Sequence, residues 1–186
     1  MYISHDIYMN TRGQELQSSG NAREQELRTQ LNPRDHIPRF VVARWAETLP
    51  SHITLCGSYR RECKLLGDID ILVPISHFES TLVELKIIPY THGTTRCSGF
   101  IKVGRGYVQI DVCAYRPGEY AYMLLYFTGS REFNIRMRAI AKKKGYLLSN
   151  TGMYKVATPH KVIAAVDERS IFVKLDMAYV RAKNRA

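Results

Sequence analysis

Two aspartates separated by one residue are the strongest chemical signal in the sequence. Asp68 and Asp70 lie in an otherwise apolar run, residues 66–73. In a β-strand successive side chains alternate between faces, so both carboxylates point to one face while Ile69 between them points to the other. Two carboxylates so close repel each other unless a divalent cation lies between them, and Mg²⁺ suits such a pair together with phosphate oxygens. The spacing therefore predicts a metal site.

A third carboxylate, Asp111, lies in a second run of strict alternation, residues 107–113. The apolar side chains of this run occupy one face and Asp111 the other. If this strand pairs beside the first, Asp111 shares the metal site. Two metal ions about 3.5–4 Å apart can activate an attacking hydroxyl and stabilise the leaving oxygen of an in-line displacement.

The residues before the first strand favour a phosphate-binding turn. Gly57 and Ser58 follow the apolar segment 53–56 and open a predicted helical turn, where free backbone N–H groups attract an anion. Ser58 and Arg61 could then hold the β- and γ-phosphates of a nucleotide. An isolated Asp-x-Asp also occurs at solvated strand ends, and this neighbouring turn favours the metal interpretation.

A polar helix face is predicted further along the chain. Ser130 is a plausible N-cap of a helix that ends at Gly145. Its apolar stripe comprises Phe133, Met137, Ile140 and Ala141. On a different face Arg131, Asn134 and Arg138 follow at i, i+3 and i+7, so all three can meet one ligand.

These blocks resemble the family X DNA polymerases, the DNA polymerase beta group. Residues 57–61, 67–70 and Asp111 are similar to the family's palm. Residues 126–130, 133–134 and 137–139 are similar to its nucleotide-selecting thumb segment. The resemblance runs from about residue 32 to the C-terminus, with both blocks in the family's order.

The resemblance implies a role for each matched residue. The catalytic and metal-binding residues would be Asp68, Asp70 and Asp111, holding two Mg²⁺ ions that Mn²⁺ can replace. The nucleotide-binding residues would be Gly57, Ser58, Arg61, Gly67, Tyr126, Phe127, Gly129, Arg131 and Asn134. The template-binding residues would be Arg138, Lys142 and Lys143. Tyr126 and Phe127 would crowd a ribose 2′-hydroxyl, and the Gly129–Ser130 peptide bond is expected to be cis; core packing is the other interpretation of the two aromatic residues.

The expected fold is α+β. A nucleotidyltransferase palm with a small mixed sheet and helices is expected over residues 32–117, and a helical thumb with a β-hairpin over 118–186; residues 1–31 are polar and expected to be a flexible extension. The predicted helices of the palm begin at residue 33, with Ile37, Phe40, Val41, Trp45 and Thr48 on the inner face, and near residue 77. Its strands are predicted at 53–56, 66–73, 95–103 and 107–113. The predicted thumb elements are helices at 119–127, 131–144 and from 167, and a hairpin of strands 146–149 and 153–156.

Some positions depart from the family pattern. The larger members carry an N-terminal lyase domain whose lysine forms a Schiff base, but the first lysine of this chain is Lys64. We therefore expect no lyase domain. Glu62 and Leu66 stand where the family has glycine and serine, Arg131 stands at an often acidic position, and Gln109 replaces a frequent arginine.

Composition agrees with a nucleic-acid partner. The 186 residues carry 27 Lys and Arg against 17 Asp and Glu, a formal net charge of +10, which also fits an anionic membrane. No run approaches the roughly 18 apolar residues of a membrane span, and the four cysteines show no CxxC spacing. We expect an intracellular, soluble monomer with reduced cysteines that does not bind membrane.

The predicted activity is DNA-directed DNA synthesis. A primer 3′-hydroxyl would attack the α-phosphate of a dNTP on gapped or primer–template DNA, with Asp111 or a water taking the proton. The combination of palm and thumb is similar to the minimal family X polymerase of a large DNA virus, which fills short repair gaps. A DNA ligase acting downstream is an expected partner. Two alternatives stay open: a nucleotidyltransferase acting on RNA, protein or a small molecule, and a non-catalytic DNA-binding module.

Overall fold

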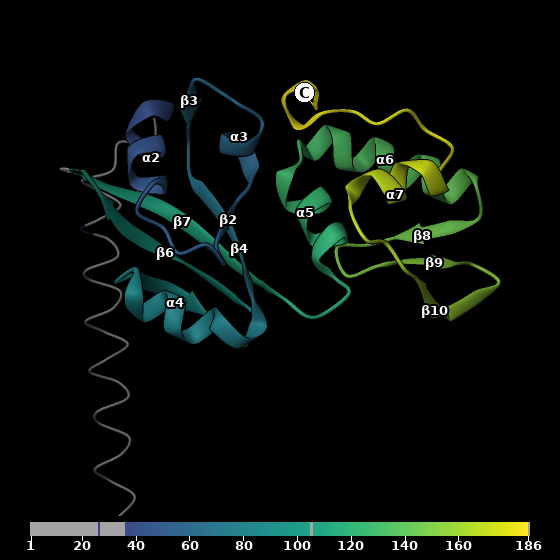
Figure 1. The fold of residues 1–186 in the computed structure, drawn as a ribbon, viewed down its shortest axis with the longest axis horizontal. Coiled ribbons are helices and arrows are strands. Elements are labelled where there is room, and N and C mark those ends of the chain that lie inside the picture. The colour runs from purple at the N-terminus through teal and green to yellow at the C-terminus, as the bar shows by residue number, and fades with distance from the viewer. Residues whose placement is uncertain (1–25, 27–35, 105, 186) are drawn as a thin grey trace, which may run out of the picture.

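The structure, a computed structural model, describes Glu26 and residues 36–104 and 106–185. It has two lobes side by side, one built on a mixed β-sheet and one built mainly from helices (Figure 1). The predicted α+β class is confirmed. Apart from Glu26, the extension predicted for residues 1–31 lies outside the described residues.

Five strands form the sheet of the first lobe, in the order β2-β4-β7-β6-β5. Their bounds are Thr54–Leu55 (β2), Ile69–Pro74 (β4), Gly106–Tyr115 (β7), Arg96–Val103 (β6) and Ile88–His92 (β5). Strands β4 and β7 are parallel, whereas the other three neighbouring pairs are antiparallel. The predicted mixed sheet is confirmed, although the sequence did not predict β5.

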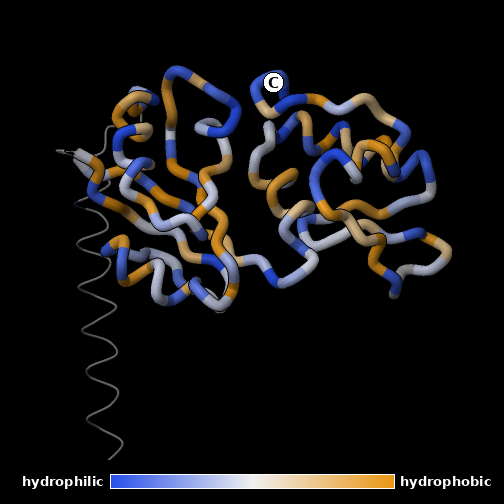
Figure 2. Tube along the Cα trace, in the orientation of Figure 1, coloured by the Kyte–Doolittle hydropathy of each residue, from blue (hydrophilic) through white to orange (hydrophobic). Residues whose placement is uncertain are grey.

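The two parallel strands are buried on both faces. On one face Ile69, Ile71 and Val73 of β4 are fully buried, as the alternation predicts, and pack against helices α2 (Arg39–Ala46) and α4 (Phe78–Glu84). On the opposite face Leu72 packs under α5 (Tyr120–Thr128). Hydrophobic residues therefore recur along these strands (Figure 2), and Asp70 interrupts them on the side of α5.

Helix α2 begins later than the sequence predicts. Ile37–Pro38 forms strand β1, which pairs antiparallel with β3 (Leu65–Leu66). Pro38 has no N–H and pushes the residue before it into an extended conformation, so the helix begins after it. The predicted inner positions of Phe40 and Thr48 are wrong. Phe40 is 67% exposed, Thr48 is exposed beyond the end of α2, and Val42 occupies the buried position. The predicted cap at residues 32–33 lies outside the described residues.

Short elements complete the first lobe. Helix α3 (Gly57–Arg60) follows β2, and the 3₁₀ helix η1 (Ile75–His77) leads into α4. The turn predicted at Gly57 and the helix predicted near residue 77 are therefore confirmed. Together α4, β5 and β6 form the long crossover that two parallel strands require.

The second lobe places helices on a three-stranded sheet of order β10-β9-β8. Its helices are α5, α6 (Arg131–Lys143), α7 (Glu168–Lys174) and the 3₁₀ helix η2 (Ala182–Asn184). Its strands are β8 (Tyr146–Leu148), β9 (Met153–Lys155) and β10 (Thr158–Ile163). The predicted β8–β9 hairpin is confirmed, whereas β10 was not predicted.

Local caps fix the ends of two helices in this lobe. Ser130 Oγ accepts a hydrogen bond from the Phe133 N–H at 3.2 Å, which confirms the predicted N-cap of α6. Asp167 caps α7 in the same way through Ser170 N at 2.8 Å. Ile171 and Phe172 of α7, together with Leu175 just after it, are fully buried and anchor the helix in the core.

Among the described residues, no helix combines the length and the apolar character needed to cross a lipid bilayer. The four cysteines are free thiols, in agreement with their spacing.

Candidate functional site

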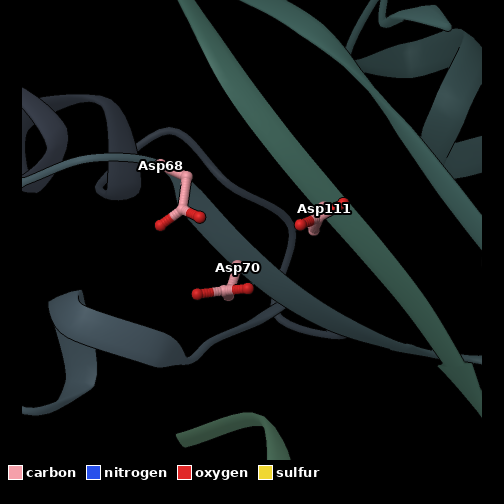
Figure 3. Close-up of side chains that lie close together, drawn as sticks. All are labelled: Asp68, Asp70 and Asp111. Carbon is pink, nitrogen blue, oxygen red and sulfur yellow. The ribbon is translucent and has the colours of Figure 1, made fainter. Parts of the chain in front are cut away.

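The three predicted carboxylates lie together at one end of the sheet. Asp70 on β4 is in register with Asp111 on the parallel strand β7, and Asp68 precedes β4 by one residue. One oxygen of each carboxylate lies within 4.8 Å of those of the other two (Figure 3). The structure thus brings the three side chains together, while their role as metal ligands stays a prediction.

The electrostatics of this cluster favour a bound cation. Burial, followed by the charges of Asp68 and Asp111, raises the pKa of Asp70 to about 7. Burial and the charge of Asp111 also raise the pKa of Asp68. A divalent cation would relieve this repulsion, and three carboxylates with room for further oxygen ligands are the donor set that Mg²⁺ and Mn²⁺ accept. The residues present therefore fit the predicted metal.

Close backbone packing helps to hold the cluster. Gly57, the first residue of α3, has a φ of +50°, and a Cβ added to it would lie 1.8 Å from Asp70 Oδ2. Only glycine lets the α3 backbone approach the carboxylate so closely. On the other side of the cluster, the Ser98 hydroxyl donates a hydrogen bond to Asp111 Oδ1.

The α3 turn also presents two candidate phosphate ligands. Ser58 Oγ is buried and has no hydrogen-bond partner within the described part of the chain, so a bound ligand could satisfy it. Arg61 directs Nη1 to the carbonyl oxygen of Thr128 at 2.6 Å, at the end of α5. Both residues were predicted to hold phosphates, and both face the same cavity.

An open cavity of about 630 Å³ joins the two lobes at Asp68 and Asp70, whereas Asp111 is not among its lining residues. The cavity is lined by Gly57, Ser58, Arg61, Asp68, Asp70, Arg96, Tyr126, Phe127, Gly129, Arg131, Asn134, Ile135 and Arg138. All the predicted nucleotide-binding residues except Gly67 are among them. Of the predicted template-binding residues, Arg138 lines the cavity, whereas Lys142 and Lys143 lie further along α6, exposed and outside it.

The polar face of α6 forms one wall of this cavity, as its spacing predicted. Asn134 Nδ2 donates to the carbonyl oxygen of Tyr126 at 2.7 Å, and the Arg138 guanidinium lies 5.3 Å from the Tyr126 ring centroid. The Gly129–Ser130 peptide bond just before α6 is cis, as expected. Tyr126 and Phe127 contribute to both the wall and the adjoining core.

Two cavity residues were missed in the sequence. Arg96, at the start of β6, places its guanidinium 5.9 Å from the Phe127 ring centroid and lines a second, adjoining cavity of about 330 Å³. Ile135 is an apolar residue, 55% exposed, among the cations of α6. Neither belongs to a motif, and only the pairing of β6 with β7 and the position of α6 bring them to the site.

A buried ion-pair network joins the lobes beside the cavity. Arg60 donates from Nη1 and Nη2 to Glu168 at 3.0 and 2.6 Å, and Arg185 Nη1 donates to the same carboxylate at 2.6 Å. Glu168 is 5% exposed and Arg185 fully buried. Burial alone would raise the pKa of Glu168, but the hydrogen bonds from the two arginines hold it below its usual value. No sequence motif indicated this network.

Comparisons with known proteins agree with this architecture. The family model of the DNA polymerase beta palm matches residues 33–102, and that of the DNA polymerase beta thumb matches residues 123–186. The Repair DNA polymerase X of African swine fever virus is 31% identical over 147 residues, covering 74% of this chain and 83% of the viral protein. DNA polymerase lambda of Rattus norvegicus is 32% identical over 148 residues, which cover 67% of this chain and 24% of the rat protein.

Solved structures share the fold. The crystal structure of Leishmania infantum polymerase beta in a ternary P/T complex matches with a TM-score of 0.68 and 24% identity, covering 82% of this chain and 77% of that one. The ternary gap complex of the same protein matches with the same TM-score and 23% identity, covering 82% and 71%.

Proposed function

Since the chain belongs to the family X DNA polymerases, the DNA polymerase beta group, we propose that it is a DNA-directed DNA polymerase that fills short gaps during DNA repair. The observation that carries this proposal is the convergence of Asp68, Asp70 and Asp111, of which Asp68 and Asp70 line a cavity whose other wall is the polar face of α6. The viral relative named as a repair polymerase supports the repair role. The proposed substrates are a dNTP and gapped or primer–template DNA, with a ligase acting on the product.

We propose that residues 32–117 act as the palm and residues 118–186 as the thumb. The two family models support this division because one matches within the first range and the other within the second. The chemistry that two Mg²⁺ or Mn²⁺ ions held by the three aspartates would supply is activation of the primer 3′-hydroxyl and stabilisation of the leaving pyrophosphate.

The protein's own residues would bind and orient the reactants. The unpartnered Ser58 hydroxyl can donate to a phosphate oxygen, and Arg61 can pair with the same triphosphate from the edge of the cavity. Tyr126 and Phe127 would contact the sugar, and Asn134 the base or sugar edge of the nucleotide. Holding the triphosphate against the primer end in this way reduces the entropic part of the barrier.

Arg138 would contact the templating strand from the α6 wall, while Lys142 and Lys143, outside the cavity, would bind backbone phosphates. Gly67, which does not line the cavity, would act only by permitting the turn before Asp68. We propose no 5′-deoxyribose phosphate lyase activity through residues 1–63, because they contain no lysine to form the Schiff base. The working form is proposed to be a monomer.

Primer extension on a duplex with a one-nucleotide gap tests the proposal. With Mg²⁺ or Mn²⁺ and the complementary dNTP, we expect a 5′-labelled primer to grow by one nucleotide, and Asp111→Ala to abolish this product. Labelling of an RNA end, a protein or a small molecule without DNA extension would indicate another nucleotidyltransferase. Retained DNA binding without transfer to any acceptor would indicate a non-catalytic binding module.

A further inference from the structure

A serine on the neighbouring strand lies directly opposite one of the three carboxylates. Ser98 of β6 is in antiparallel register with Asp111 of β7. Its hydroxyl donates a hydrogen bond to Asp111 Oδ1 across the pair. Neither Ser98 nor Asp111 lines the cavity of about 630 Å³, and Ser98 contacts the carboxylate cluster through Asp111.

The three carboxylates are held in different ways. Asp70 packs against the Cα of Gly57, which limits its rotation. Asp68 is hydrogen-bonded by its own backbone amide. For Asp111, the side-chain hydrogen bond that the structure shows comes from Ser98. A short Asp side chain without such a partner can turn about two torsions, so the serine hydroxyl is what fixes the orientation of this carboxylate.

We propose that Ser98 is a positioning residue, which orients the Asp111 carboxylate towards Asp68 and Asp70 by hydrogen bonding to Oδ1. The proposal rests on the metal-binding role of the three aspartates in the proposed function. Partners that hydrogen-bond to ligating carboxylates typically change metal affinity or activity about 10–100-fold when they are removed. Because Ser98 does not line the cavity in which the nucleotide would bind, its effect should fall on metal binding and turnover, leaving nucleotide affinity unchanged.

The test compares Ser98→Ala, Ser98→Thr and a matched control, Thr91→Ala. Thr91 lies on the next strand, β5, and its Oγ1 accepts a hydrogen bond from the backbone N–H of Ser98 at 3.3 Å without contacting Asp111. Two quantities are measured: the Mn²⁺ dissociation constant of the full chain by titration calorimetry without DNA or dNTP, and kcat and KM for the dNTP in one-nucleotide gap filling. Circular dichroism and the thermal midpoint with EDTA show whether each variant is folded.

For Ser98→Ala we expect the Mn²⁺ dissociation constant to rise and kcat to fall by about tenfold or more, with KM for the dNTP unchanged. Ser98→Thr, which keeps a hydroxyl, should restore both values to within about threefold of wild type, a tolerance well below that tenfold effect. Thr91→Ala should match wild type.

Wild-type metal affinity and kcat in a folded Ser98→Ala variant would overturn the proposal, as would an equal loss in Ser98→Thr or in Thr91→Ala. Failure of the proposed function is a separate outcome. If the wild-type protein extends no primer, the polymerase assignment fails, and the metal titration alone still decides whether Ser98 orients Asp111.

Discussion

Replacing Gly57 by alanine probes a close backbone contact of the carboxylate cluster. The new Cβ would lie 1.8 Å from Asp70 Oδ2 and 2.8 Å from its Cγ. Ordinary van der Waals contact begins at about 3.4 Å, so the carboxylate or the start of α3 must move by more than 1 Å. Because the end of a side chain yields more readily than backbone, we expect Asp70 to leave the position in which it lies beside Asp68 and Asp111.

Gly145 provides a matched control for the backbone strain. It has a φ of +76°, and a Cβ added there would meet nothing within 4 Å. A left-handed conformation costs a non-glycine residue about 1–2 kcal/mol, so both alanine variants should lose about that much stability. Only the variant at Gly57 should also displace a carboxylate.

The expected difference therefore lies in catalysis. A misplacement of about 1 Å at a reacting centre can cost on the order of 100-fold in rate. We therefore expect Gly57→Ala to lower kcat for gap filling by about 100-fold or more. The kcat of Gly145→Ala should stay within about twofold of wild type, well inside that effect. The assays are single-turnover primer extension and urea unfolding of both variants.

Wild-type turnover in Gly57→Ala would show that the site tolerates the displaced carboxylate, and the argument from close packing would be wrong. An equally large loss of activity in Gly145→Ala would show that backbone strain, rather than the contact with Asp70, is responsible.

Four further predictions concern individual side chains. Asp111→Ala should abolish nucleotide transfer with DNA affinity nearly unchanged, as measured by gap filling and fluorescence anisotropy, because the carboxylate would hold metal rather than DNA phosphate; unchanged turnover would contradict the site. Arg61→Ala should raise the dNTP dissociation constant about 10–100-fold, the worth of a charged hydrogen bond, and a constant equal to that of wild type would argue against the phosphate contact. The native Asp70 pKa of about 7 lies above its unfolded value, so ionisation of Asp70 destabilises the wild-type fold as pH rises from about 4 to about 7. In EDTA, the unfolding free energy of Asp70→Asn should therefore increase relative to that of wild type over this range, by up to about 4 kcal/mol. A difference in urea midpoints that does not change with pH would refute this. Glu168→Gln should cost about 3–5 kcal/mol in urea unfolding because it leaves a buried arginine charge uncompensated, whereas Asp176→Asn, at an exposed ion pair, should cost less than about 1 kcal/mol.

Elements with local signals could be predicted from the sequence. Helix α6 has a side-chain cap at Ser130 and a regular apolar stripe, and α7 has its cap at Asp167. The hairpin of β8 and β9 is marked by its turn residues. Each of these signals acts within a few residues, so no knowledge of the distant chain was needed.

The missed strands depend on partners that the sequence does not identify. Strand β5 contains Pro89, which weakens a strand pattern, and it exists as an edge strand because β6 pairs with it. Strand β1 consists of two residues and is held by β3. The helix predicted across β1 failed for the related reason that Pro38 sets the chain direction more strongly than the apolar periodicity does.

The candidate site also contains some residues that could be predicted from the sequence and others that could not. Asp68, Asp70 and Asp111 could be found because period-2 alternation places each on the face opposite the buried residues. Arg96 and Ser98 share that face of β6, but their relevance depends on the register between β6 and β7. Register across a sheet is fixed by packing and turns, and no motif in a single sequence shows it.

The paired arginines of α3 show why a motif does not specify the role of each member. Adjacent residues of a helical turn point in different directions, and here Arg60 reaches Glu168 in the second lobe while Arg61 reaches the cavity and the Thr128 carbonyl. Arg60 also donates to the Thr128 hydroxyl at 2.7 Å. Both arginines thus meet the end of α5, immediately before the turn into α6. Because Arg60 lies in α3 and Arg61 directly follows it, a displacement of this turn would disturb the ion pair at Glu168 as well as the cavity wall at Arg61.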